Sequence, residues 1–192
     1  MSDVATNLMR VSFIASDAVS EWRIERVHAV RGESLATAAG LARVEGHAFW
    51  DADTAAAWAL HGVRSNERYL EREEKQRLAS IQQGLGRTAS TSGALIPIRK
   101  SGAWWELSQD ERRAVFEARS RHIAIGARYL PAVARRLYHA RDLGGPFDFL
   151  TWFEFSDADA GAFDELVGRL RETEEWQYVI REVEVRVRRA TP

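Results

Sequence analysis

The 192-residue chain contains no cysteine. Disulfides, thiolate nucleophiles, iron–sulfur clusters and thiolate metal sites are therefore excluded on chemical grounds. Any bound metal ion must be held by histidine, carboxylate or tyrosine. Common nucleotide, metalloprotease and hydrolase motifs are also missing, since no G-x-x-x-x-G-K-S/T, G-x-G-x-x-G, H-E-x-x-H or G-x-S-x-G pattern occurs.

An excess of charge of one sign is also lacking. The 27 Lys and Arg residues are balanced by 28 Asp and Glu residues, whereas a nucleic-acid partner would require a basic surface. No apolar run approaches the ~20 residues of a membrane span, and the start MSDVATNLMR lacks a basic segment followed by an apolar one. We therefore expect no nucleic-acid partner, no membrane and a cytoplasmic location.

The first half of the chain has weak local patterns. Residues 10–15, 22–30 and 57–63 are β-prone and predict strands. Residues 34–42 are rich in Ala and Leu and favour a helix, and the pattern of residues 66–83 predicts a strongly charged amphipathic helix. The strand and helix of residues 57–83 resemble a shortened, degenerate copy of residues 95–126.

The second half is clearer. It predicts a strand through residues 95–105, a capped helix, strands at 132–141 and 147–155, a second helix begun by Ser156, and a closing alternating strand. This β-α-β-β-α-β order is the split βαβ unit of ferredoxin-like α+β folds. Helices would cover one face of the sheet, and the other face must pack against something else. Two such sheets facing each other would enclose a pocket.

Ser108 and Glu111 form an S-x-x-E capping box at the start of the first of these helices. In a continuous helix Val115, His122 and Gly126 fall on one face. That spacing turns His122 inward. A lone inward histidine is more often a core residue than a ligand, so the residues around His122 must decide its role.

Pro131 argues against continuation of the helix, because proline lacks an amide and restricts the residue before it. Arg135 then lies on the next strand, where it would face His122 across a pocket. Arg135 is a candidate anion clamp, or else an ordinary salt-bridge partner. His139 shares its face of the strand and is a second-rank candidate ligand. The seven Trp residues would most often be core, although a flat cofactor also needs aromatic walls.

Several blocks resemble the chlorite dismutase family, and specifically its short, dimeric branch. They are GVRSNERYLEREEK, IQQGLGR, ALIPIRKSGAWWELSQDERRAVFEARSRHIA, YLPAVARRLYHARDLGGPFDFLTWFEF and TEEWQYVIREVEVRVRR. The resemblance runs from about residue 62 to residue 189. It implies a homodimer whose subunit pairs two ferredoxin-like units in an α+β barrel, with a reduced N-terminal half (1–92) and a haem-binding C-terminal half (93–192).

The resemblance also implies a haem b site. His122 matches the proximal iron ligand, and Glu175 matches the carboxylate that binds its other ring nitrogen, with Glu174 as the near alternative. Arg135 matches the distal arginine. The remaining matches are Lys100 near a haem propionate, Trp104 and Trp105 in the proximal pocket, and Gln82 on the distal side.

The activity implied is conversion of chlorite to chloride and dioxygen, through a ferryl and a hypochlorite-level intermediate that Arg135 retains. A coproheme decarboxylase is the nearest rival function; Arg135 argues against it, whereas Gln82 and Tyr69 argue for it. A non-enzymatic haem-binding module and a barrel dimer without cofactor are also compatible with the sequence.

Overall fold

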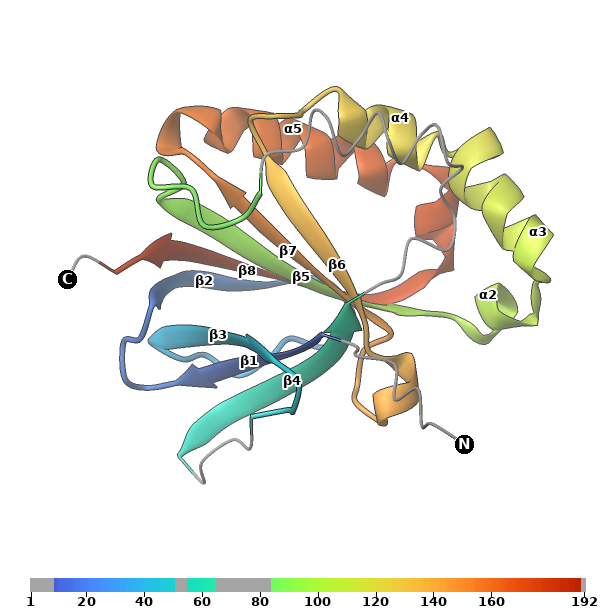
Figure 1. Cartoon of the computed structure of the whole chain (residues 1–192). Coiled ribbons are helices and arrows are strands. Elements are labelled where there is room, and N and C mark those ends of the chain that lie inside the picture. Colours follow the sequence, from blue (N-terminus) through green and yellow to red (C-terminus); the bar gives the residue numbers. More distant parts are fainter. Residues whose placement is uncertain (1–8, 51–54, 65–83, 191–192) are drawn as a thin grey trace, which may run out of the picture.

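Eight antiparallel strands form one closed barrel in the computed structural model, which describes residues 9–50, 55–64 and 84–190 (Figure 1). The order around the barrel is β1-β3-β2-β8-β5-β7-β6-β4. The strands are β1 (Arg10–Ser16), β2 (Trp22–Arg31), β3 (Gly40–Gly46), β4 (Ala56–Arg64), β5 (Ser92–Lys100), β6 (Ala134–His139), β7 (Phe149–Phe155) and β8 (Val179–Arg189). The predicted α+β barrel is therefore confirmed.

The α-helices of the described residues all come from the second half of the chain. They are α2 (Gly102–Glu106), α3 (Gln109–Arg113), α4 (His122–Ala127) and α5 (Ala160–Arg171). A π-helical segment, η1 (Ala114–Arg119), and three 3₁₀ segments, η2 (Arg141–Leu143), η3 (Asp157–Asp159) and η4 (Glu174–Tyr178), accompany them. In Figure 1, α3, α4 and α5 arch over the C-terminal strands. None of the helices placed by the structure is long and apolar enough to cross a membrane.

The two halves of the barrel repeat one strand order. From β4 the barrel reads β4-β1-β3-β2 and then β8-β5-β7-β6, so each half runs fourth, first, third and second. The C-terminal half has the element order predicted for it. The prediction that residues 57–83 repeat residues 95–126 is wrong. The strand β4 is equivalent to β8, and the N-terminal repeat starts at β1.

The barrel interior is a core of large side chains. The inward residues of β8 are Val183, Val185 and Val187, as their alternation predicts, and all three are buried. Trp22 and Trp152 meet edge to face at the centre, with ring centroids 5.2 Å apart. Side chains of this size fill the interior of a small barrel.

A second core lies between the helices and the outer face of the C-terminal strands. Helix α5 buries Phe163, Leu166, Val167 and Leu170, the apolar face that its spacing predicts. Phe163 stacks on Phe155 of β7 at 4.6 Å. The predicted cap is also present, since the Asp159 amide donates to the Ser156 hydroxyl.

Residues 34–42 do not form the predicted helix. Strand β3 begins at Gly40, and Leu41 is fully buried in the barrel beside Ala15 and Trp22. A Cβ at Gly40 would lie 2.1 Å from the Ala18 carbonyl oxygen, so only glycine fits. Burial and close approach override local helix propensity here.

The predicted strand through residues 95–105 ends at Lys100, and residues 102–106 are helical. Ser101 is the extended N-cap residue, and the Trp104 amide donates to its carbonyl oxygen. The buried Trp104 packs against the Lys100 ammonium, 4.4 Å from the ring centroid. The helical turn therefore places the Trp104 ring where it makes a cation–π contact with Lys100. The predicted helix at 66–83 lies outside the described residues.

Candidate functional site

The helix that begins at Ser108 breaks just before His122. The capping box is present, because the Ser108 amide donates to Glu111 and the Glu111 amide donates to the Ser108 hydroxyl. Beyond α3, however, the chain widens into π-helical turns over Ala114–Arg119, and Arg121 is left-handed with φ of 52°. The prediction of one unbroken helix with His122 on a continuous stripe is wrong.

Glu117 supports this break. Its carboxylate accepts a hydrogen bond from the Ile123 amide at 2.8 Å, which caps the first turn of α4. The Arg121 amide donates to the Glu117 carbonyl oxygen at 2.9 Å. His122 is thereby the first residue of α4, directed by the break and the cap instead of by helical spacing. π-Helical turns inside helices occur frequently at functional sites. Sequence reasoning missed Glu117, because a glutamate in a charged helix carries no distinctive signal.

His122, Glu175 and Lys100 form a relay of hydrogen bonds. The Nδ1 atom of His122 lies 2.7 Å from Oε2 of Glu175, and the Lys100 ammonium donates to Oε1 of the same carboxylate at 2.8 Å. Glu175 is 4% exposed and Lys100 is 3% exposed. The Glu175 amide donates to the Ser120 hydroxyl, which fixes the carboxylate-bearing turn. Three of the residues predicted for the site therefore converge.

Glu175, and not the alternative Glu174, holds the imidazole. Glu174 instead pairs with Arg119 at the surface, at 2.9 Å. Burial alone would raise the pKa of Glu175, but His122 and Lys100 outweigh it and bring that pKa to about 2. The ionised carboxylate engages Nδ1 and leaves Nε2 as the nitrogen available to a metal ion.

Arg135 packs against the same helix. A Cβ at Gly126 would lie 2.4 Å from the Nη1 atom of Arg135, so the guanidinium rests directly on this glycine. Gly126 follows His122 by one turn of α4, about 6 Å along the axis. Burial lowers the pKa of Arg135 and the charge of Glu117 opposes the shift, yet an arginine stays protonated in a protein. A permanent positive charge and an imidazole thus share one side of α4.

Strand β6 separates two chemical environments. Inside the barrel, Arg136 and Tyr138 both donate hydrogen bonds to the Glu45 carboxylate. The Nη1 atom of Arg136 lies 3.1 Å from each carboxylate oxygen. The alternate residues Arg135, Leu137 and His139 belong to the outer face. Leu137 is 39% exposed there. The outer face therefore combines one cation with accessible apolar surface.

Trp105 has an unsatisfied polar atom. Its ring stacks on Phe149 at 5.9 Å, and the guanidinium carbons of Arg141 and Arg112 lie 3.7 and 5.2 Å from its centroid. Its Nε1 atom is buried and finds no hydrogen-bond partner in the parts of the chain that the structure places. Gln82 lies outside the described residues.

Trp176 lies beside His122, although a tryptophan was expected most often to be a core residue, with a cofactor wall as the alternative. Its ring is nearly parallel to the His122 imidazole, with centroids 6.5 Å apart. The Lys100 ammonium lies 5.5 Å from the same indole ring. Phe116 stacks on His122 at 4.4 Å. Nothing in the local sequence distinguishes these two aromatic residues from ordinary core positions.

Comparison with known proteins gives one consistent result. A family model described as chlorite dismutase matches residues 35–190. The structure of a dimeric chlorite dismutase from Nitrobacter winogradskyi is 53% identical, with a TM-score of 0.86, and the match covers 94% of this chain and 99% of that one.

Two further comparisons are more distant. A chlorite dismutase from Ideonella dechloratans is 34% identical over 87 residues, which is 45% of this chain but only 28% of that protein. A mutant chlorite dismutase from Candidatus Nitrospira defluvii has 21% identity and a TM-score of 0.69, with 96% of this chain and 91% of that chain covered. At this identity the likeness shows the fold alone.

Proposed function

The chain belongs to the chlorite dismutase family, and on that premise we propose that it binds haem b and converts chlorite to chloride and dioxygen. The observation that carries the proposal is the pairing on α4. An imidazole held by a buried carboxylate lies one helical turn from a glycine on which a guanidinium rests. The first arrangement suits an iron ligand, and the second suits an anionic substrate.

The residues present fit a haem. His122 offers a single imidazole, which would be enough because the macrocycle itself supplies four nitrogen ligands to the iron. The buried Nε1 of Trp105, close to Arg112 and Arg141, suits the carboxylate of a propionate. The exposed Leu137 offers an apolar surface for a porphyrin face. Haem iron, when bound, would supply the centre at which chlorite gives up an oxygen atom.

His122 would hold the iron through Nε2, and Glu175 would make the imidazole more electron-donating by its hydrogen bond to Nδ1. Lys100 was expected near a propionate. Its buried ammonium is instead bonded to Glu175, so we assign it to the relay, where it fixes the carboxylate and balances its charge. Trp104 would act through its contact with Lys100.

Arg135 would retain the reactive oxychlorine anion until the two oxygen atoms combine. A guanidinium suits this role because it is always charged and presents a fixed fork of donors. One charge-assisted hydrogen bond contributes about 1.5–3 kcal/mol, which is roughly ten- to a hundredfold in retention. Gln82 remains a proposed distal partner outside the described residues.

We further propose that two ferredoxin-like units make up the barrel, with the boundary near residue 92, and that the chain forms a homodimer. The repeated strand order supports the first point. The dimeric relative at 53% identity supports the second. The cytoplasmic location stays a prediction.

The deciding experiment is chlorite addition to haem-loaded protein in an oxygen electrode, with chloride measured in the same sample. We expect one dioxygen and one chloride per chlorite consumed. A stable haem spectrum without oxygen would contradict the proposal and favour a haem-binding module. Mass spectrometry of the bound porphyrin tests for a coproheme decarboxylase, because coproheme carries four propionates and haem b carries two.

A further inference from the structure

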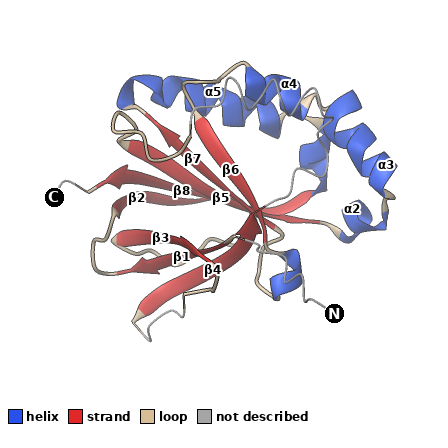
Figure 2. Cartoon of the chain, in the orientation of Figure 1, coloured by secondary structure: helices blue, strands red, loops and turns tan. Residues whose placement is uncertain are grey.

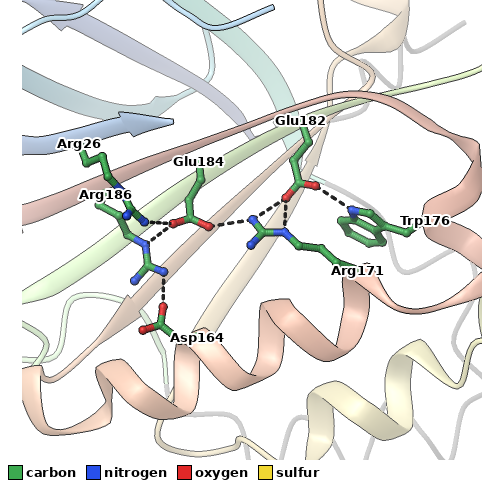
Figure 3. Close-up of polar contacts among 7 residues, drawn as sticks. All are labelled: Arg26, Asp164, Arg171, Trp176, Glu182, Glu184 and Arg186. Atoms are coloured by element: carbon green, nitrogen blue, oxygen red, sulfur yellow. Dashed lines mark hydrogen bonds and ion pairs between the residues drawn. The ribbon is translucent and has the colours of Figure 1, made fainter. Parts of the chain in front are cut away.

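An ion cluster with two buried carboxylates lies between β8 and α5, on the outer face of the barrel (Figure 3). Its carboxylates are Glu182 and Glu184 of β8 and Asp164 of α5, and its guanidinium groups are Arg26, Arg171 and Arg186. Glu182 is 1% exposed and Glu184 is 2% exposed. Burial of charge at this level is stable only when each group is paired and hydrogen-bonded.

Glu182 is held on both sides. One oxygen accepts two hydrogen bonds from Arg171, at 2.8 Å from Nε and 2.6 Å from Nη2. The other oxygen accepts a hydrogen bond from Nε1 of Trp176 at 2.7 Å. Both guanidinium donors converge on one oxygen and hold it in place, and the bond at the other oxygen completes the orientation of the carboxylate. The Trp176 indole is therefore tied at its polar edge to a rigid acceptor (Figure 3).

The same indole contacts the proposed iron-binding relay with its ring face. The Lys100 ammonium lies 5.5 Å from its centroid, and that ammonium bonds to Glu175, which holds His122. The indole and the imidazole are within 25° of parallel. Trp176 thus links the ion cluster to the relay. The edge of its indole bonds to the cluster, and the face of the ring contacts the relay.

We propose that Glu182, oriented by Arg171, is a positioning residue for the iron-binding histidine and acts through Trp176. Tying the indole edge keeps its face against the Lys100 ammonium. The ammonium in turn keeps Glu175 aligned on Nδ1 of His122. This inference rests on the proposed haem function, although its first link, from Glu182 to the imidazole, exists in the chain before any cofactor is added.

Glu184 provides the matched control. It lies on the same strand and face, is buried to the same degree and also accepts a hydrogen bond from Arg171, at 2.7 Å. Its other partners within the described part of the chain are Arg26 and Arg186, and Trp176 bonds to Glu182 instead. Glu184→Gln removes the same charge from the same cluster without touching the indole.

The experiment compares three single variants, Glu182→Gln, Glu184→Gln and Trp176→Phe. A double variant combines Glu182→Gln with Trp176→Phe. Two signals are recorded on the full chain. Before haem is added, NMR follows the His122 Nδ1 proton, assigned by its loss in His122→Ala. After haem b is added, resonance Raman of the ferrous protein follows the iron–histidine stretch.

We expect Glu182→Gln and Trp176→Phe to move the Nδ1 proton signal upfield and the iron–histidine stretch to lower frequency. The reason is that the hydrogen bond between Nδ1 of His122 and Glu175 becomes weaker. Glu184→Gln should leave both signals in place. Glu182→Gln should add no shift in the Trp176→Phe background, since coupled residues are not additive. If Glu182→Gln does not fold, the Trp176→Phe and Glu184→Gln shifts decide by themselves.

Equal shifts from Glu184→Gln and Glu182→Gln would overturn the proposal, because the cluster would then act only as general support. A further shift from Glu182→Gln without the Trp176 indole would overturn the route through Trp176. Failure of the wild-type chain to bind haem would contradict the proposed function, while the Nδ1 signal would still test the positioning role.

Discussion

The two halves of the barrel share one strand order but differ in what lies outside it. Every buried residue of the second core comes from positions 94–179, so among the residues that the structure describes this layer covers the C-terminal strands alone. The connection between β1 and β2 spans residues 17–21, whereas the equivalent connection between β5 and β6 spans residues 101–133 and carries three helices. Figure 2 shows α3, α4 and α5 on the side of the C-terminal strands.

The difference shows where this fold makes room for chemistry. Trp22, Trp152 and Tyr138 occupy the barrel interior, which belongs to both halves. His122 and Arg135 instead belong to the layer between the helices and the sheet, which the described residues form in the C-terminal half. One half therefore provides closure and core, and the other half adds a second layer with the candidate site.

The largest expected effect is on haem binding, and it should differ between two histidines, one from each half of the barrel. His122→Ala should abolish stoichiometric haem binding, because the imidazole is the proposed iron ligand. His61→Ala in β4 is the control, since His61 bonds to Ser12 on the other half of the barrel at 3.0 Å. Titration followed by the haem absorption spectrum measures both. Full haem binding by His122→Ala would remove the residue from the site.

The next effect separates the two faces of β6. Arg135→Ala should lower chlorite turnover roughly ten- to a hundredfold and release more hypochlorite, because one charge-assisted contact is lost. Arg136→Ala should keep the oxygen yield per chlorite but lower the free energy of unfolding by about 1–3 kcal/mol, because Glu45 loses a bonded cation. An oxygen electrode, a hypochlorite trap and urea unfolding report these outcomes. An undiminished rate without leakage in Arg135→Ala would exclude its proposed role.

A smaller effect concerns stability and pH in the helix-covered half. Burial would raise the pKa of Glu184, but hydrogen bonds from Arg171 and Arg186 outweigh it and bring that pKa to about 2, below its usual 4.5. The unfolded chain then binds more protons, so stability present above pH 4.5 is lost as the pH falls towards 2. Urea unfolding between these values should show a shallower decline in Glu184→Gln. Hydrogen bonds, the largest from Arg169, also lower the pKa of Glu165, but this pair is exposed and screened by solvent, so Glu165→Gln should flatten the slope less than Glu184→Gln does.

The smallest effects compare glycines of two helices. Gly126→Ala places a methyl group against the Arg135 guanidinium and should reduce turnover several-fold while the protein stays folded. Gly168→Ala in α5 has open space around it and should raise the free energy of unfolding by about 0.5–1 kcal/mol. Turnover and urea unfolding of both variants check this. Unchanged turnover in Gly126→Ala would mean that Arg135 works from another position.

Features encoded by neighbouring residues were predicted correctly. The Ser108 and Ser156 caps, the apolar face of α5 and the alternation of β8 each depend on residues within a few positions of one another. Their physical signals, a capping side chain or a hydrophobic period, are therefore complete in the local sequence.

Features set by distant partners were not predictable in this way. Leu41 is drawn into β3 by the barrel interior, and Trp104 of α2 packs edge to face on Tyr178, which is far away along the chain. The Lys100–Glu175 pair spans 75 positions, and only the family resemblance brought both residues into the site. Periodicity alone directed His122 inward for the wrong reason, because the left-handed Arg121 lies between it and the helix before it.

The contacts of Glu45 inside the barrel have a consequence for folding fidelity. Arg136 and Tyr138 reach Glu45 only when β6 pairs in its observed alignment with β7. Sliding β6 by one residue would exchange its faces, placing Arg135 among the aromatic side chains and turning both Glu45 partners outward. A misaligned strand would thus leave the half-buried carboxylate without its partners and would be less stable than the observed pairing. In this way Glu45 favours the strand alignment that places the site residues on the opposite side of the sheet.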